Sequence, residues 1–281
     1  MTAFALDLTA QIPLLACGPM RQPGVIIHAF STRLGGSSEP PYASLNLGYG
    51  TGDSRACVLH NRARFCQALG FDADNLMTLR QVHGNRVVVV TTASDLSLAA
   101  GTPGDGLLTN RSHLPLAVIT ADCFPIILTV PSLPAVGILH AGWMGTASRL
   151  VPTAIARLSE EFEVSAKDVF AAIGPGIGGC CYEIDEVSAE PFIAQFPAAV
   201  GVYRPSRPGH LYLDLQQAIL LQLHTAGVPA GQVWAADLCT ACHAGWFYSY
   251  RRDGPRSGRM LNVVMIKTTT HPACRELLRA L

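Results

Sequence analysis

This sequence lacks an excess of charge of either sign: 20 Lys and Arg residues balance 20 Asp and Glu residues in a chain of 281. Proteins that bind nucleic acid or an anionic membrane surface ordinarily carry an excess of basic residues. The neutral balance therefore argues against both kinds of partner.

We expect neither an export signal nor a membrane span. The first apolar segment has no basic region before it and is interrupted by Asp7, Gln11 and Pro13, which does not fit a secretory signal. The apolar region 114–142 contains Asp122 and is broken by Pro125, Pro131 and Pro134, which are too many interruptions for a membrane span. Nine cysteines at irregular spacing do not resemble the paired pattern of a secreted disulfide framework. We therefore expect a protein of the reducing cytoplasm.

Strands and helices alternate along the chain without a repeat or a change of composition. We expect one domain, 1–281, of the α/β (mixed α+β) class, with mixed β-sheets flanked by helices. Outside the central stretch, strands are expected at 25–30, 76–82, 86–91, 169–173, 232–236 and 261–266, and helices at 53–69, 146–162, 185–195, 214–226 and 272–281.

The central stretch, 116–146, carries two chemical groups inside apolar sequence. Three apolar runs bounded by Pro and Gly predict buried strands, with Cys123 at the break between the first two and His140 at the end of the third. Because side chains at strand ends meet in one crevice in α/β folds, we expect Cys123 and His140 to lie together. Asp122 needs a polar or charged partner if it is buried. Gly142 and Gly145 indicate that the backbone passes close to a neighbouring group, where a side chain would not fit.

Three other patterns have structural and functional interpretations. The glycine-rich segment 174–179 predicts a tight turn rather than a phosphate loop, because Pro175 removes a backbone donor and no Lys-Ser/Thr follows. Cys239 and Cys242 form half of a zinc site, and no second C-x-x-C or H-x-x-x-H completes it. The cluster 248–254 is either a solvated loop or, through Arg251, a site for an anionic or polyhydroxyl ligand.

Taken together, the motifs resemble the YfiH-like laccase-domain family over nearly the whole chain. Its members carry the names polyphenol oxidase, purine nucleoside phosphorylase and peptidoglycan editing factor. The motifs are H-A-F-S-T-R-L-G-G-S at 28–37, Q-V-H-G at 81–84, G-D-G-L-L-T at 104–109, T-A-D-C-F-P at 120–125, H-A-G-W at 140–143, Y-E-I at 182–184 and Y-S-Y-R-R-D-G at 248–254. The resemblance implies a fold similar to toxin-type cysteine deamidases and a site built from His83, Cys123 and His140.

Two chemistries compete for these three side chains. Two imidazoles and a thiolate leave one open position on a tetrahedral zinc ion, which suits adenosine deamination, and copper accepts the same donors. Without metal, a histidine would deprotonate Cys123 for the acyl chemistry of a Cys/His amidase or editing hydrolase acting on a peptidoglycan precursor. A true multicopper laccase is not expected, because the nine histidines form no H-x-H pair.

Our favoured interpretation is purine nucleoside phosphorolysis with a possible adenosine deaminase activity at a zinc-type His83/Cys123/His140 site. The expected partners are phosphate and a small nucleoside such as adenosine, inosine or methylthioadenosine. Arg33 and Arg251 are the candidates for binding phosphate, from the resemblance and their charge. Met144 departs from the family, whose members usually carry Arg at this position, which weakens the case for an anion site there.

Overall fold

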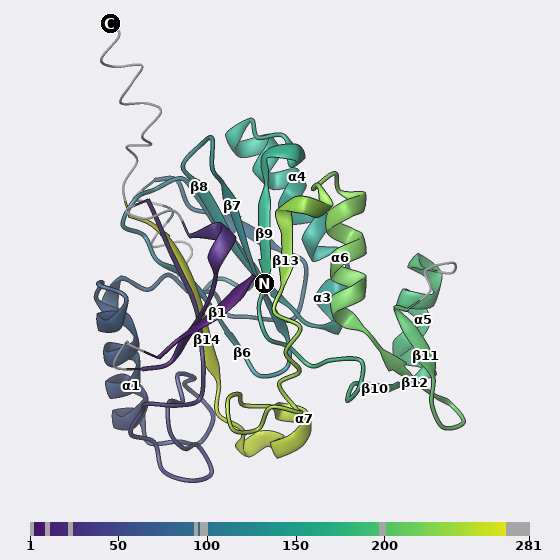
Figure 1. Cartoon of the computed structure of the whole chain (residues 1–281), viewed down its shortest axis with the longest axis horizontal. Helices are drawn as coiled ribbons and strands as arrows, with labels where there is room; N and C mark the ends of the chain where they lie inside the picture. Colours follow the sequence, from purple (N-terminus) through teal and green to yellow (C-terminus); the bar gives the residue numbers. More distant parts are fainter. Residues whose placement is uncertain are drawn as a thin grey trace, which may run out of the picture.

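The computed structural model describes residues 3–8, 12–21, 25–92, 95, 101–196 and 201–267. Two large sheets form its centre (Figure 1). The five-stranded sheet has the order β1 (Phe4–Asp7), β2 (Leu14–Cys17), β3 (Ile26–Ser31), β14 (Met260–Ile266) and β6 (Leu116–Thr120). The six-stranded sheet has the order β13 (Val233–Ala235), β9 (Phe170–Ile173), β7 (Phe124–Val130), β8 (Ala135–Ala141), β5 (Gly106–Thr109) and β4 (Val87–Val89).

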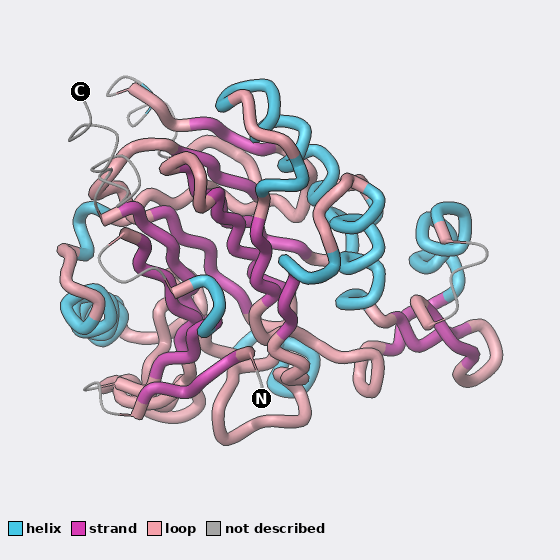
Figure 2. The backbone as a smooth tube through the Cα atoms, turned by 45° about the horizontal axis from the view of Figure 1, so that its top comes forward, coloured by secondary structure: helices cyan, strands magenta, loops and turns pink. Residues whose placement is uncertain are grey.

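Helices cover the outer faces of both sheets, and a small sheet stands apart from them. The helices are α1 (Arg55–Ala68), α3 (Trp143–Ala147), α4 (Leu150–Phe162), α5 (Glu186–Gln195), α6 (Leu215–Thr225) and α7 (Tyr250–Asp253). The small sheet has the order β10 (Glu183–Asp185), β12 (His210–Leu213) and β11 (Tyr203–Pro205), and together with α5 it projects beyond α6 (Figures 1 and 2).

Successive side chains along the strands point to opposite faces of the sheets, and this divides the core into layers. In β7, Ile126 and Leu128 join the cluster that packs under α4 and α6, whereas Ile127 faces the five-stranded sheet and contacts the cluster containing Phe30 and Leu116. On the far side of that sheet, a third cluster packs against α1. Successive strand residues point to opposite faces, so this alternation gives the order α1, five-stranded sheet, six-stranded sheet, then α4 with α6. Both sheets are buried between layers, which explains why their strands read as continuous apolar runs.

The mixed α/β class predicted from the sequence is confirmed. β7 pairs antiparallel with β8 and β9, whereas β4 pairs parallel with β5 and β13 pairs parallel with β9. Most predicted elements are present within a few residues, among them α1, α5, α6, β3, β9, β13 and β14. The helix predicted at 272–281 lies outside the described residues.

Two predicted elements differ from the structure. The strand expected at 76–82 is reduced to isolated bridges of Met77 and Arg80 to two different segments, so no continuous ladder forms. It also makes no hairpin with β4, which pairs with β5 instead. The helix expected at 146–162 is split into α3 and α4 by Arg149, whose φ of 64° is left-handed. Pro152 then falls in the first turn of α4, where the missing amide costs little.

No helix in the described ranges is long and apolar enough to cross a membrane.

Candidate functional site

Three strand ends meet at one edge of the six-stranded sheet. β8 lies between β7 and β5, and their antiparallel registers set Pro125 opposite His140 and Gly106 opposite Leu139. Cys123, directly before β7, and Asp105, directly before β5, therefore flank His140 near the end of β8. Strand register alone gathers residues that are up to 35 positions apart in the sequence.

Asp105 holds both histidines. Its carboxylate accepts the backbone N–H groups of Val82 at 3.2 Å, His83 at 2.9 Å and Gly84 at 2.7 Å, which fixes the loop that carries His83. The same carboxylate lies 2.8 Å from Nδ1 of His140. A donor at Nδ1 leaves Nε2 of His140 for a second partner, so Asp105 sets both the position and the tautomer of this imidazole.

His83, Cys123 and His140 offer one ligand atom each, and these atoms lie within 4.8 Å of one another. The two imidazole rings meet edge to face, with their centroids 4.7 Å apart. Two nitrogens and one sulfur are a donor set that suits a tetrahedral transition-metal ion with one position open to water or substrate. Asp105 behind His140 is the outer carboxylate that such a ligand usually requires. The residues present therefore fit a metal ion.

Cys123 and His140 also perturb each other. Burial opposes ionisation of Cys123, but the charge of His140 and the hydrogen bonds from both histidines outweigh it and lower the thiol pKa to about 6. For His140, burial favours the neutral form, whereas the Cys123 thiolate and Asp105 outweigh it and raise the pKa to about 9. The metal-free protein at neutral pH therefore holds a thiolate next to an imidazolium.

A cavity of about 570 Å³ opens in front of this group. Its wall presents the aromatic side chains of Trp143, Tyr182 and Tyr250 together with the cations of Arg251 and Arg259. The size lies in the range of small-molecule sites, which combine apolar walls with a few polar groups. Met144 also lines the cavity, where its thioether adds no charge.

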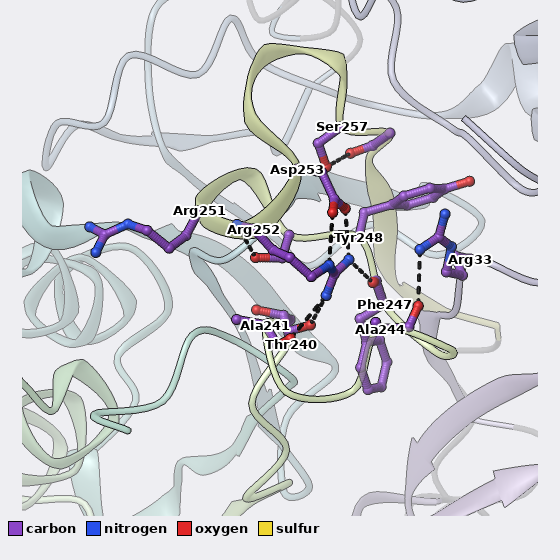
Figure 3. Close-up of polar contacts among 12 residues, drawn as sticks. Arg33, Thr240, Ala241, Ala244, Phe247, Tyr248, Arg251, Arg252, Asp253 and Ser257 are labelled. Atoms are coloured by element: carbon purple, nitrogen blue, oxygen red, sulfur yellow. Dashed lines mark hydrogen bonds and ion pairs between the residues drawn. The ribbon is translucent and has the colours of Figure 1, made fainter. Parts of the chain in front are cut away.

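The two predicted phosphate ligands differ in position. Arg251 lines the cavity, stacks 5.0 Å above the centroid of the Tyr182 ring and extends away from the neighbouring hydrogen-bonded cluster (Figure 3). Arg33 does not line the cavity. Its guanidinium donates to the carbonyl oxygen of Ala244 at 2.9 Å (Figure 3). It also donates to the carbonyl oxygen of Ala43 at 2.9 and 3.0 Å, which ties two loops together. The structure therefore brings Arg251, but not Arg33, to the site.

Asp122 has the partners that its burial demands. Its carboxylate accepts the Thr240 hydroxyl at 2.7 Å and the backbone N–H of Arg251 at 2.6 Å. Its φ of 89° lies in the left-handed region, which turns the chain between β6 and β7. Because both carboxylate oxygens are engaged, Asp122 fixes the loop beside Cys123 rather than presenting a base to the cavity.

The glycines after His140 are required by close approach. A Cβ at Gly142 would lie 2.9 Å from Sγ of Cys123 and 3.1 Å from Cδ2 of His83, and one at Gly145 would lie 2.9 Å from the Gly84 carbonyl. The close approach expected at Gly142 and Gly145 is therefore confirmed. The glycine-rich segment 174–179 is closely packed as well, since a Cβ at Gly176 would lie 2.5 Å from the Phe124 ring. It is not the tight turn predicted from the sequence, because Gly176 forms a parallel bridge with Cys239 and the chain turns only from Gly179.

Sequence reasoning missed Asp105, Tyr182 and Arg259 as site residues. The signal for Asp105 was a carboxylate between two glycines directly before the short strand G-L-L-T, where burial makes charge costly without partners. Tyr182 belongs to the Y-E-I motif at 182–184, but that motif assigned it no role. Arg259 gave no comparable signal, because it reaches the cavity only through long-range folding.

The lowered thiol pKa predicts how Cys123 of the metal-free protein reacts. Only the thiolate is alkylated, so labelling of Cys123 by iodoacetamide should rise with pH to a midpoint near 6 and then level off. Mass spectrometry of the Cys123 peptide over a pH series measures this. In His140→Ala the midpoint should move up, whereas a wild-type midpoint at about 8.5, the value of an ordinary thiol, would contradict the thiolate–imidazolium pair.

Gly142→Ala should crowd Cys123 and His83 without straining the backbone, since φ at this position is −84°. Crowding of this kind costs about 1–3 kcal/mol, which corresponds to about a 5- to 150-fold loss of zinc affinity. Gly231→Ala is the matched control, because no atom lies within 4 Å of its added Cβ. Equal zinc affinity for both variants would show that the close approach is not needed.

Comparison with known proteins identifies a matching family and several relatives. Residues 27–267 match the family described as multi-copper polyphenol oxidoreductase laccase. The chain is 40% identical over 247 residues to a protein of Deinococcus radiodurans named purine nucleoside phosphorylase, covering 87% of this chain and 91% of that protein. It is 36% identical over 253 residues to purine nucleoside phosphorylase YlmD of Geobacillus stearothermophilus, covering 88% and 92% of the two chains.

Solved structures agree with these sequence relationships. The crystal structure of YlmD from Geobacillus stearothermophilus gives a TM-score of 0.86 at 34% identity and covers 95% of this chain and 100% of that one. The structure of YfiH from Bacillus licheniformis gives a TM-score of 0.86 at 32% identity, covering 93% and 99%. The chain therefore belongs to the laccase family of YlmD and YfiH, as the motifs of its sequence predicted.

Proposed function

We propose that this protein is a purine nucleoside phosphorylase that acts on adenosine, inosine and methylthioadenosine. The observation that carries the proposal is that one cavity combines the His83/Cys123/His140 group, aromatic walls and two arginines. Relatives with 32–40% identity bear the name purine nucleoside phosphorylase, which supports the same reaction.

In this reaction a phosphate oxygen bonds to C1′ of the ribose while the N-glycosidic bond breaks. The bonding electrons leave with the purine, which takes up a proton, so the products are ribose 1-phosphate and the free base. The chain must therefore bind a flat base, hold an anion near C1′ and supply a hydrogen-bond donor to the leaving purine.

The aromatic wall suits the base. Trp143, Tyr182 and Tyr250 line the cavity, and aromatic side chains of this kind pack against a flat purine. Burial and the nearby Cys123 thiolate raise the pKa of Tyr182, which keeps its hydroxyl protonated across the physiological range. Tyr182 is accordingly our candidate for a hydrogen-bond donor to the purine.

Arg251 and Arg259 are our candidates for phosphate. Both line the cavity, and guanidinium groups bind phosphate oxygens in a two-pronged geometry. Because Arg33 lies outside the cavity and Met144 is uncharged, Arg259 takes the place of Arg33 beside Arg251 in the anion-binding pair expected from the sequence.

We propose zinc as the ion held by His83, Cys123 and His140, although copper accepts the same donors. A zinc ion there would supply a Lewis acid that polarises an oxygen of phosphate or water, which suits both phosphorolysis and adenosine deamination. The protein's own part is to keep Cys123 as a thiolate and to orient His140 through Asp105. Multicopper oxidation is not proposed, because this is the one histidine-containing ligand group within the described residues.

Thiolate ligands and nine cysteines require a reducing compartment, so we propose that the protein works in the cytoplasm.

The direct test is product analysis. Purified protein is incubated with adenosine or inosine, with and without phosphate, and the products are separated by chromatography before and after chelation. We expect phosphate-dependent release of free base that disappears in Cys123→Ala and after chelation. Cys57→Ala, on α1 and away from the cavity, is the control and should keep full activity. The absence of any phosphate-dependent release would exclude phosphorolysis.

One observation favours a second candidate. The Cys123 thiolate, the His140 imidazolium and the Asp105 carboxylate have the chemistry of the nucleophile, the general acid that protonates the leaving amine, and the orienting group of a cysteine amidase. Such an amidase or editing hydrolase, acting on a peptidoglycan precursor, would keep its activity after chelation and lose it on alkylation of Cys123. Phosphorolysis that depends on zinc would be lost under both treatments, so chelation separates the two candidates.

A further inference from the structure

Four cysteines gather outside the cavity lining. Cys180 and Cys181 follow β9, Cys239 and Cys242 follow β13, and their sulfur atoms all lie within 4.8 Å of one another. Sγ of Cys242 lies 3.6 Å from Sγ of Cys180 and 3.4 Å from Sγ of Cys181. The sequence contains no second C-x-x-C or H-x-x-x-H, as expected, but sequence reasoning missed the adjacent pair Cys180/Cys181, which lies next to Cys239 and Cys242.

Sheet topology builds this cluster. β9 and β13 are parallel neighbours, with Ala171 opposite Val233, so the loops that follow them leave the same edge of the sheet. The pairing continues past both strands, where Gly176 bridges to Cys239 and the Thr240 N–H donates to the Gly176 carbonyl at 2.9 Å. The two cysteine pairs are thus held together by backbone pairing that needs no metal.

The spacing of the sulfurs suits a tetrahedral ion. Four thiolates around zinc at about 2.3 Å place neighbouring sulfurs about 3.8 Å apart. The distances of 3.4 and 3.6 Å from Cys242 lie within a few tenths of an ångström of that value. All four residues are free thiols in the structure.

Backbone amides support charge on the sulfur of Cys239. The Gly178 N–H donates to Sγ of Cys239 at 3.2 Å, and the backbone of Cys242 forms a second hydrogen bond to it. Amide donors to a sulfur stabilise the thiolate form, which is the form that binds metal. Backbone N–H donors are therefore already aimed at one of the four sulfurs.

We propose that Cys180, Cys181, Cys239 and Cys242 bind zinc as a closed tetrathiolate site, separate from the His83/Cys123/His140 group. Soft thiolate donors select zinc over harder cations. Four protein ligands leave no open position, which is the arrangement of a structural rather than a catalytic zinc site.

A metal ion at this site would restrain residues that line the cavity. Tyr182 follows Cys181 directly, and Thr240 follows Cys239 and donates its hydroxyl to Asp122 at 2.7 Å. Asp122 in turn receives the backbone N–H of Arg251. An ion that locks the two cysteine pairs therefore restrains both Tyr182 and the Asp122–Arg251 contact beside Cys123.

Metal content tests the proposal in the full chain. The double variant Cys123→Ala/His140→Ala lacks the first donor set, is purified under reducing conditions, and should retain about one zinc per chain. Adding Cys242→Ser should reduce zinc to background, whereas adding Cys57→Ser, a free thiol on α1, should leave it unchanged.

Cobalt substitution gives a second readout that does not rely on the fold of the Cys242→Ser protein. Cobalt(II) in the double variant should show the sulfur-to-metal charge transfer and intense visible bands of a tetrahedral tetrathiolate site. Two results would overturn the proposal: four reactive thiols with no bound zinc or cobalt, or a loss of two titratable thiols under denaturing, non-reducing conditions, which indicates a disulfide.

Discussion

The carboxylate of Asp105 is the group on which the candidate site depends. It is buried, and burial opposes its ionisation, yet the hydrogen bond with His140 and the amides of Gly84 and His83 outweigh that cost and lower its pKa. The charged group therefore binds the loop before β4 to the end of β8. Without it, a buried cation at His140 would lose one of its two anionic partners and the loop carrying His83 would lose three hydrogen bonds.

One edge of the six-stranded sheet carries all the proposed chemistry. Cys123 precedes β7, His140 lies near the end of β8, and Asp105 precedes β5. β9 runs antiparallel to β7, and β13 runs parallel to β9, so the loops with the four cysteines leave that same edge. The catalytic-type group and the proposed structural site are thus neighbours along one row of strand ends. The hydrogen bond from the Thr240 hydroxyl to the Asp122 carboxylate connects the loop of the cysteine cluster to the loop that carries Cys123.

Sequence predicted the centre of this arrangement well, because its signals are local. Apolar runs bounded by Pro and Gly marked β6, β7 and β8, and strand ends marked Cys123 and His140. What failed depends on contacts between distant segments. Arg33 has the charge of a phosphate ligand, but its position is decided by carbonyls at 43 and 244. The break at Arg149 depends on one left-handed residue that has no sequence signature, and the cysteine cluster depends on the parallel pairing of β9 with β13.

The most direct measurement of the central claim is the zinc affinity of the His83/Cys123/His140 group in Asp105→Asn. The zinc concentration that protects Cys123 from alkylation reports this site alone, with Asp185→Asn, at the exposed start of α5, as the control. Loss of an outer carboxylate typically weakens metal binding about 10- to 100-fold, and that is the result expected for Asp105→Asn against an unchanged control. Equal protection in Asp105→Asn and the wild-type protein would contradict the role assigned to this carboxylate.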